Sequence, residues 1–290
     1  MVVACSGGAD SIGLLVLAAD AGLVPTAVYV DHGLRADSAA DADVVTAAAR
    51  DLGVEWRVVR VEVTPGGNLE ARARTARYAA LHDARRALGA TAILVGHTAD
   101  DQAETVLLNL LRGSASAGLA GMAPRRGPVA RPLLAVRRAE VRAVAASRGL
   151  SVVDDPTNAD TRWRRAWIRH DVLPLLERGS QRDLVPILTR QAEVFRAESD
   201  FLDGLGDELL GAASDPSADG LAVDPMRSAP EVVVRRAVRR WVGSPPPSAD
   251  EVERIVAVVR GDRVACELSG GRRVRRTAGR VQIDDPRQLP

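Results

Sequence analysis

The residues Ser6-Gly7-Gly8-Ala9-Asp10-Ser11 directly follow a short apolar run, Val2–Cys5. The run predicts a buried strand, and the apolar spacing after Asp10 predicts a helix. Two adjacent glycines allow a tight turn that brings backbone N–H groups close to a ligand, and a helix N-terminus adds partial positive charge. The segment therefore predicts a phosphate-binding loop. A carboxylate beside a polyphosphate also predicts that Asp10 holds Mg²⁺.

The same residues have two other interpretations. The common P-loop requires a lysine, and all 39 basic side chains of this chain are arginines. An ordinary strand-to-helix turn with Asp10 as the helix N-cap would need no ligand at all. The phosphate interpretation is preferred because the glycines, the strand and the helix occur together.

A second group of polar residues lies within Gly96–Thr105, where another strand is expected to end. Asp101, Glu104 and Thr105 have the spacing of one helical face. His97 and Asp101 are expected at the edge of a sheet, where a carboxylate can share Mg²⁺ with Asp10 or orient a nucleophile. Acidic residues also stabilise the first turn of any helix, so a structural role explains Glu104 equally well.

Apolar runs and helical patterns alternate along the first part of the chain. The expected strands are Val2–Cys5, Thr26–Asp31, Trp56–Val63, Thr91–Gly96 and Val129–Leu134, and the expected helices are 11–21, 37–52, 69–89, 101–112 and 137–148. This order predicts an α/β fold with an open, mostly parallel sheet and helices on both faces. Ligands bind at the carboxyl ends of such strands, so Asp31, His32 and Gly33 should join the loop and His97 at one edge.

The remaining pattern predicts three parts. Residues 1–178 form a catalytic domain, 179–224 a helical linker and 225–290 a small α+β domain. Within 179–224 we expect a long acidic helix over about 181–211 and a linker at Asp215–Asp219. Within the small domain, the expected helices are 229–242 and 249–259, and the expected strands are 263–268, 272–276 and 280–284. Residues 113–121 are rich in Gly, Ala and Ser and predict a loop.

Composition narrows the class of protein. Basic and acidic residues almost balance overall, but 112–180 and 225–290 are basic whereas 181–224 is acidic. Such segments are typical of polyanion-binding surfaces and, equally, of solvated ion-paired helices. Two cysteines exclude a disulfide framework or a cysteine-rich zinc site. With no apolar run of membrane-spanning length and no signal peptide, a cytoplasmic location is expected. Because Met1 lies within the first expected strand, we expect that the natural start lies upstream or that a short tail was removed.

Residues over most of the chain resemble those of the tRNA(Ile)-lysidine synthases, members of the PP-loop ATP pyrophosphatase superfamily. The Ser6–Ser11 loop marks only the superfamily. The segments that carry the closer resemblance are Val30–Arg35, Asn68–Arg74, Gly96–Thr105, Arg112–Met122, Arg131–Leu134, Asp154–Asn158 and Ile168–Leu176. The small domain resembles the family's tRNA-binding domain, a weaker match.

The resemblance implies a reaction and its participants. ATP adenylates the C2 oxygen of the wobble cytidine in the CAU anticodon of tRNA(Ile), pyrophosphate leaves, and the ε-amine of L-lysine displaces AMP. The loop would hold pyrophosphate, Asp31–Gly33 would lie near the adenosine, and Asp10 with Asp101 would hold Mg²⁺. His97 or a nearby carboxylate would assist deprotonation of the amine. Arg112 and Arg169 are preferred over Arg131 and Arg165 as tRNA contacts, and a homodimer is left open.

One motif departs from the family pattern, which reads Arg-Asn-x-x-Arg before Leu-Pro-x-Leu. Here the stretch is Arg165-Ala166-Trp167-Ile168-Arg169, so the Asn is lost. Trp167 could stack on a base or simply contribute to packing.

Two alternative functions come from different classes. A PP-loop tRNA thiolase is disfavoured because such enzymes use cysteines, and Cys5 and Cys266 form no C-x-x-C motif. A nucleotide-binding module without turnover is disfavoured because plain binding would not need both Asp10 and Asp101.

Overall fold

The computed structural model describes residues 1–33, 38–63, 66–154 and 160–285. The chain divides into two compact units, Met1–Arg196 and Ala197–Pro290, which are described separately. Helix α9 (Leu184–Ala213) begins in the first unit and ends in the second. Residues 179–224, predicted as a linker, are thus divided between the units. Leu34-Arg35 and Asp155–Asn158, which contributed to the family resemblance, lie outside the described residues.

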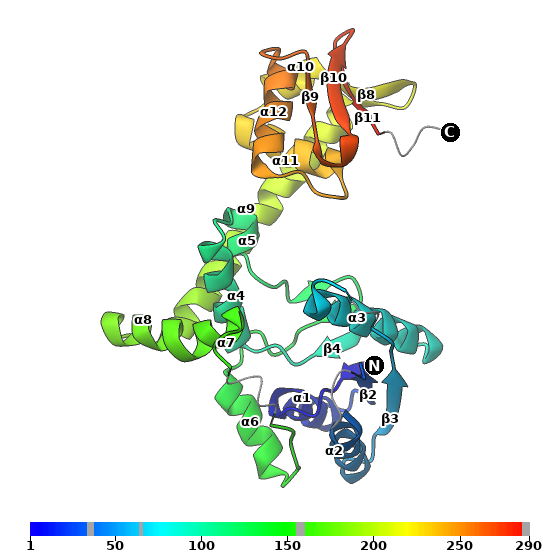
Figure 1. The fold of residues 1–290 in the computed structure, drawn as a ribbon, viewed down its shortest axis with the longest axis vertical. Helices are drawn as coiled ribbons and strands as arrows, with labels where there is room; N and C mark the ends of the chain where they lie inside the picture. The colour runs from blue at the N-terminus through cyan, green and yellow to red at the C-terminus, as the bar shows by residue number, and fades with distance from the viewer. Residues whose placement is uncertain (34–37, 64–65, 155–159, 286–290) are drawn as a thin grey trace. The chain divides into compact units, whose positions relative to one another are not determined.

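The first unit is built on a six-stranded sheet with the order β3-β2-β1-β4-β6-β5. Figure 1 labels strands β2, β3 and β4 of this sheet. The strands are β1 (Val2–Ala4), β2 (Thr26–Asp31), β3 (Glu55–Arg60), β4 (Ile93–Val95), β5 (Arg125–Arg126) and β6 (Val129–Ala130). Strands β3, β2, β1, β4 and β6 are parallel, and only β5 runs antiparallel to its neighbour. The predicted open, mostly parallel sheet is confirmed.

Helices cover both faces of this sheet. The covering helices are α1 (Ala9–Asp20), α2 (Ser38–Asp51) and α6 (Arg138–Ser147) on one face and α3 (Leu69–Ala87) on the other. Helix α4 (Ala99–Leu111) belongs instead to a separate core with Ile168 and Leu173. Val3 belongs to a core with α1, α2 and α6, whereas its neighbour Val2 belongs to a core with α3. Both valines are fully buried, because successive side chains of a strand point to opposite faces.

Several elements differ from the sequence-based expectation. The strand predicted over Val129–Leu134 ends at Ala130, and residues 132–135 form turns. The predicted loop at 113–121 contains a one-turn helix, α5 (Ser116–Leu119). Beyond α6, the chain forms α7 (Arg164–Trp167), a π-helical turn η2 (Ile168–Val172) and α8 (Leu173–Ser180).

The second unit contains a five-stranded antiparallel sheet with the order β7-β8-β11-β10-β9. Its elements after α9 are β7 (Ser214–Asp215), β8 (Ala218–Ala222), α10 (Val223–Ser228), α11 (Glu231–Val242), α12 (Ala249–Arg260), β9 (Ala265–Glu267), η3 (Ser269–Gly271), β10 (Arg273–Thr277) and β11 (Arg280–Asp284). The stretch Asp215–Asp219, predicted to be non-helical linker, is instead a β-hairpin turn. Asp215 accepts hydrogen bonds from the backbone and side chain of Ser217 and so closes this turn.

Nothing in the described part of the chain is a helix with both the length and the apolar character needed to cross a membrane.

Candidate active site

The loop Ser6–Ser11 connects β1 to α1 in a tight turn. Gly7 has a φ of +83°, and a Cβ there would lie 2.6 Å from Cγ2 of Val153, so both conformation and space require glycine. Ser11 Oγ accepts a hydrogen bond from the N–H of Ser6 at 3.2 Å and donates one to the carbonyl of Gly8 at 2.8 Å. These bonds fix the loop from inside.

Gly8, not Asp10, occupies the N-cap position of α1, and no side chain caps the helix there. The interpretation of Asp10 as a capping residue is therefore wrong. Uncapped N–H groups at a helix start form a site for an anion. Asp10 follows in the first turn, where its carboxylate is available for other partners.

The loop opens into a cavity of about 1020 Å³ at the carboxyl ends of β1, β2 and β4. The residues predicted from the sequence that line it are Ser6, Gly8, Ala9, Asp10, Ser11, Asp31, His32, Gly33, His97, Asp101 and Arg169. A Cβ at Gly96 would lie 2.8 Å from the backbone oxygen of Asp10, so the end of β4 meets the start of α1. Arg112 lies elsewhere, exposed at the end of α4.

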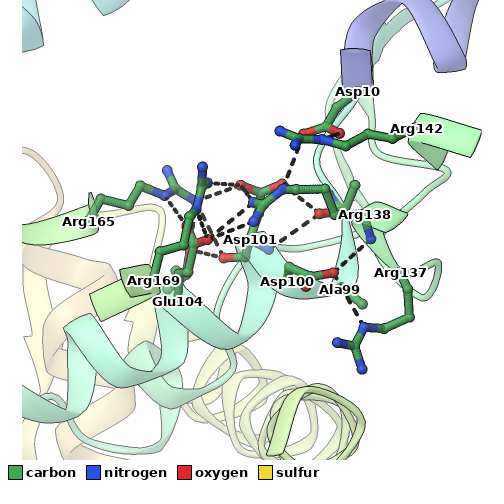
Figure 2. A network of polar contacts seen from close by, with 12 residues as sticks. Asp10, Ala99, Asp100, Asp101, Glu104, Arg137, Arg138, Arg142, Arg165 and Arg169 are labelled. Carbon is green, nitrogen blue, oxygen red and sulfur yellow. Dashed lines mark hydrogen bonds and ion pairs between the residues drawn. The ribbon is translucent and has the colours of Figure 1, made fainter. Parts of the chain in front are cut away.

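Arg138 contacts three carboxylates beside this cavity, as Figure 2 shows. Its Nε lies 3.3 Å from Oδ2 of Asp10, and its Nη2 lies 2.9 Å from Oδ1 of Asp101. The same nitrogen donates to Oε1 of Glu104 at 3.1 Å. One guanidinium thus balances negative charges from α1 and α4.

Glu104 is the most buried carboxylate of the network, with 1% of its side chain exposed. Besides Arg138, it accepts hydrogen bonds from Arg165 at 2.9 Å and from Arg169 at 2.7 Å. Arg165 and Arg169 lie on α7 and η2, so Glu104 ties these short helices to α4 (Figure 2). The structure thus gives Glu104 several partners that its sequence position alone did not indicate.

Both carboxylate oxygens of Asp101 have partners. Oδ2 accepts hydrogen bonds from the N–H and hydroxyl of Thr98, which form the capping box of α4, and Oδ1 faces Arg138. Burial alone would raise the pKa of Asp101, but Arg138, Arg165 and the Thr98 N–H together hold it below its usual value. Asp101 is therefore a stable anion.

Asp10 lies in a different environment. Burial raises the pKa of its carboxyl despite the opposing charge of Arg138. Its Oδ1 accepts no hydrogen bond among the described residues, and Nε of Arg142 is 3.5 Å away. Asp10 thus has one buried oxygen available for a further ligand.

The two histidines of the cavity wall are both held neutral. Burial lowers the pKa of His97 to about 4, and the positive charges of Arg165, Arg131 and Arg74 act in the same direction. Burial, with Arg77, also lowers the pKa of His32. Nδ1 of each ring is buried without a hydrogen-bond partner in the described part of the chain.

Sequence reasoning did not single out Arg138. One sequence feature could have pointed to Arg138. Arg137 and Arg138 lie at the start of α6, where a positive side chain is unfavourable because of the helix dipole. Asp100 offsets this effect by accepting the backbone N–H of Arg138 at 2.7 Å. A residue that breaks a local rule at the ligand-binding edge is a candidate for a role in the site.

Replacing Glu104 by Gln should destabilise the first unit by about 3–5 kcal/mol, because three arginines lose a buried countercharge. Urea unfolding at neutral pH measures this. Glu140→Gln, at an exposed capping-box carboxylate of α6, is the matched control and should cost no more than about 1 kcal/mol. Equal losses in both variants would contradict a special role for the buried network.

The lowered pKa of His97 predicts a pH dependence of stability. Between about pH 6.5 and pH 4 the unfolded chain binds a proton at His97 that the folded chain does not, so stability falls as the pH is lowered. His97→Gln should reduce this loss by as much as about 3 kcal/mol. Urea unfolding of both proteins across this range, referred to pH 7, provides the measurement, and parallel curves would contradict the prediction.

Comparison with known proteins places these features in a family. Residues 1–176 match the family model of the PP-loop domain. The chain is 43% identical over 263 residues to the tRNA(Ile)-lysidine synthase of Nocardia farcinica, covering 89% of this chain and 81% of that one. It is 46% identical over 242 residues to the tRNA(Ile)-lysidine synthase of Mycolicibacterium paratuberculosis, covering 83% and 73%.

A solved structure supports the fold alone. The U34-tRNA thiolase of Methanococcus maripaludis, solved with its [4Fe-4S] cluster, superposes with a TM-score of 0.55 at 18% identity, covering 67% of this chain and 72% of that one. At this identity the likeness concerns the arrangement of strands and helices. The sequence identity of the first two relatives extends over most of their length, and by it this chain belongs to the tRNA(Ile)-lysidine synthase family.

Proposed function

We propose that this protein joins L-lysine to C2 of the wobble cytidine in the CAU anticodon of tRNA(Ile), using ATP. The observation that carries the proposal is the extended identity to lysidine synthases over a chain whose phosphate loop, Asp10 and Asp101 border one cavity. A cytoplasmic location, where tRNA and ATP are available, is part of the proposal.

ATP would bind with its phosphates at the loop and its adenosine towards the end of β2. The uncapped start of α1 supports the first part, because free N–H groups and the helix dipole favour an anion. Asp31, His32 and Gly33 line the same cavity on the neighbouring strand. The N–H of Gly33 donates to Oδ1 of Asp31 at 2.9 Å, which holds this turn in place.

The residues fit a role for Mg²⁺, with Asp10 as the main protein ligand. Mg²⁺ is commonly held by one or two carboxylates together with substrate phosphates. Asp10 has a buried oxygen without a hydrogen bond in the described part, whereas both oxygens of Asp101 are engaged by Thr98 and Arg138. The cation would neutralise charge on the phosphates. Asp101 would support Asp10 through Arg138, which contacts both.

The chemistry requires an activated cytidine, because C2 is a poor electrophile. The C2 oxygen attacks the α-phosphorus of ATP, and pyrophosphate leaves. The lysine amine then attacks C2, the C2–O bond breaks, AMP leaves, and the amine loses its proton. Positive groups at the cavity, namely Arg142, Arg165 and Arg169, would stabilise negative charge on the phosphates during the first step.

His97 is suited to orienting the amine rather than to removing its proton. Its unpartnered Nδ1 can accept a hydrogen bond from the amine. A pKa of about 4 makes the neutral ring a weak base. Proton removal therefore falls to a carboxylate of the cavity or to water, with His97 as the acceptor that aligns the nitrogen.

We further propose that Arg112, Arg169 and the 225–290 region contact tRNA. Arg112 is exposed at the end of α4. In the second unit, Arg235, Arg236 and Arg240 are paired with Glu253, Asp203 and Asp207, respectively. These pairs neutralise much of the basic charge that the sequence shows there, so tRNA binding by this unit would rely on its remaining arginines.

The proposal predicts incorporation of labelled lysine into tRNA. With ATP and Mg²⁺, label should enter a transcript of tRNA(Ile) with the CAU anticodon, with release of AMP and pyrophosphate. A transcript of the methionine tRNA with the same anticodon is the control and should remain unlabelled. Absence of label from both transcripts would contradict the proposed function.

Asp101→Asn should lower kcat for lysine incorporation by about 10²-fold, because Arg138 loses a charged partner and its arrangement with Asp10 is disturbed. Asp83→Asn, at an exposed aspartate of α3, is the matched control and should retain activity. A nucleotide-binding module would bind ATP equally well in both variants and form no product. Unchanged turnover by Asp101→Asn would contradict the proposed role of Asp101.

A further inference from the structure

A second hollow of about 420 Å³ lies in the first unit between α4 and the segment that leads into α7. It is lined by Leu108, Leu111, Thr161, Arg162, Arg164 and Trp167. We call these residues the Trp167 groove. Its walls combine apolar side chains from α4 with one indole ring and two arginines.

Trp167 does not serve as a core residue. Its neighbours Ala166 and Ile168 are buried and hold α7 and η2 against α4, whereas 40% of Trp167 is exposed. Leu111, across the groove, is 61% exposed. Large apolar side chains that face solvent together mark a binding surface more often than isolated ones do.

The charge at the groove favours an anionic partner. Arg162 is paired through two hydrogen-bonding nitrogens with Asp160. Arg164 is exposed and has no ion pair among the described residues. An aromatic ring beside an exposed guanidinium suits an unstacked nucleobase together with its phosphate.

The groove lies along α4 from the buried carboxylate network of the active site. On α4, Leu108 and Leu111 follow Glu104 at spacings of four and seven residues, so they lie on the same side of the helix about 6 and 10 Å further along. On α7 and η2, Arg165 and Arg169 turn towards Glu104, as Figure 2 shows, while Trp167 lines the groove. Stacked nucleotides are about 3.4 Å apart, so the groove lies within about three nucleotides of Glu104.

We propose that the Trp167 groove is the subsite for an RNA base within about three nucleotides of the reacting cytidine, with Trp167 as the stacking surface and Arg164 as the phosphate contact. The inference rests on the proposed function, because it takes the RNA strand to pass the cavity. The proposal gives Trp167, which is not part of the Arg138 carboxylate network, a role in tRNA affinity. Chemistry at the cytidine should therefore be unaffected once tRNA is bound.

The test compares Trp167→Ala, Trp167→Phe and Trp56→Ala. Filter binding of the tRNA(Ile) transcript should show a dissociation constant raised about 10-fold in Trp167→Ala and less than about 3-fold in Trp167→Phe, whose ring can still stack. Trp56 is the matched control, because it is 36% exposed on the edge strand β3, and its replacement should leave tRNA affinity unchanged. Thermal unfolding verifies that each variant is folded.

Kinetics separate this inference from the proposed function. In lysine incorporation, Trp167→Ala should raise KM for tRNA by the same factor and leave kcat, and KM for ATP, near the parent values. An unchanged dissociation constant and KM in a folded Trp167→Ala variant would overturn the subsite, even if lysine is incorporated. If the parent incorporates no lysine, the proposed function fails, but the binding comparison still decides whether the groove binds RNA.

Discussion

The active-site wall depends on a single buried cation, the guanidinium of Arg138. Asp10, Asp101 and Glu104 come from two helices and would repel one another in a partly dry cavity. Arg138 forms ion pairs with all three carboxylates, and its positive charge offsets their mutual repulsion. Because its fork presents several donors in fixed directions, it also helps to orient each carboxylate, together with Thr98 at Asp101 and with Arg165 and Arg169 at Glu104. Asp101 and Asp10 then differ in their partners. Both oxygens of Asp101 are paired, whereas Oδ1 of Asp10 accepts no hydrogen bond among the described residues.

This arrangement requires α1 and α6 to approach closely. A Cβ at Gly13 of α1 would lie 2.5 Å from the backbone oxygen of Val141 on α6, so the two helices touch through backbone. The starts of the helices are correspondingly near each other, and Arg138 at the start of α6 reaches Asp10 at the start of α1. The lack of a side chain at one position thus enables an ion pair between residues 128 apart in sequence.

The sequence predicted those features of the site that depend on neighbouring residues in the chain. The loop Ser6–Ser11 and the start of α4 could be recognised because glycines, apolar spacing and acidic residues stand next to one another. Arg138 could not, because its partners come together only after the sheet forms. The linker prediction for Asp215–Asp219 is wrong because Asp, Pro and Ser, which occupy this stretch, are as frequent in hairpin turns as in linkers. The exposure of Trp167 could not be predicted from the sequence either, because it depends on which side chains of α4 pack against it.

Strand β1 has a consequence for the accuracy of the phosphate loop. It is only three residues long, and Val2 and Val3 fill the cores on opposite faces of the sheet. Sliding this strand by one residue would move each valine into the wrong core, and both neighbours, β2 and β4, would lose their pairing with it. A change of register is therefore opposed both by the cores on the two faces of the sheet and by the pairing with the two neighbouring strands. This short strand therefore fixes the position of the backbone N–H groups in the loop that follows it.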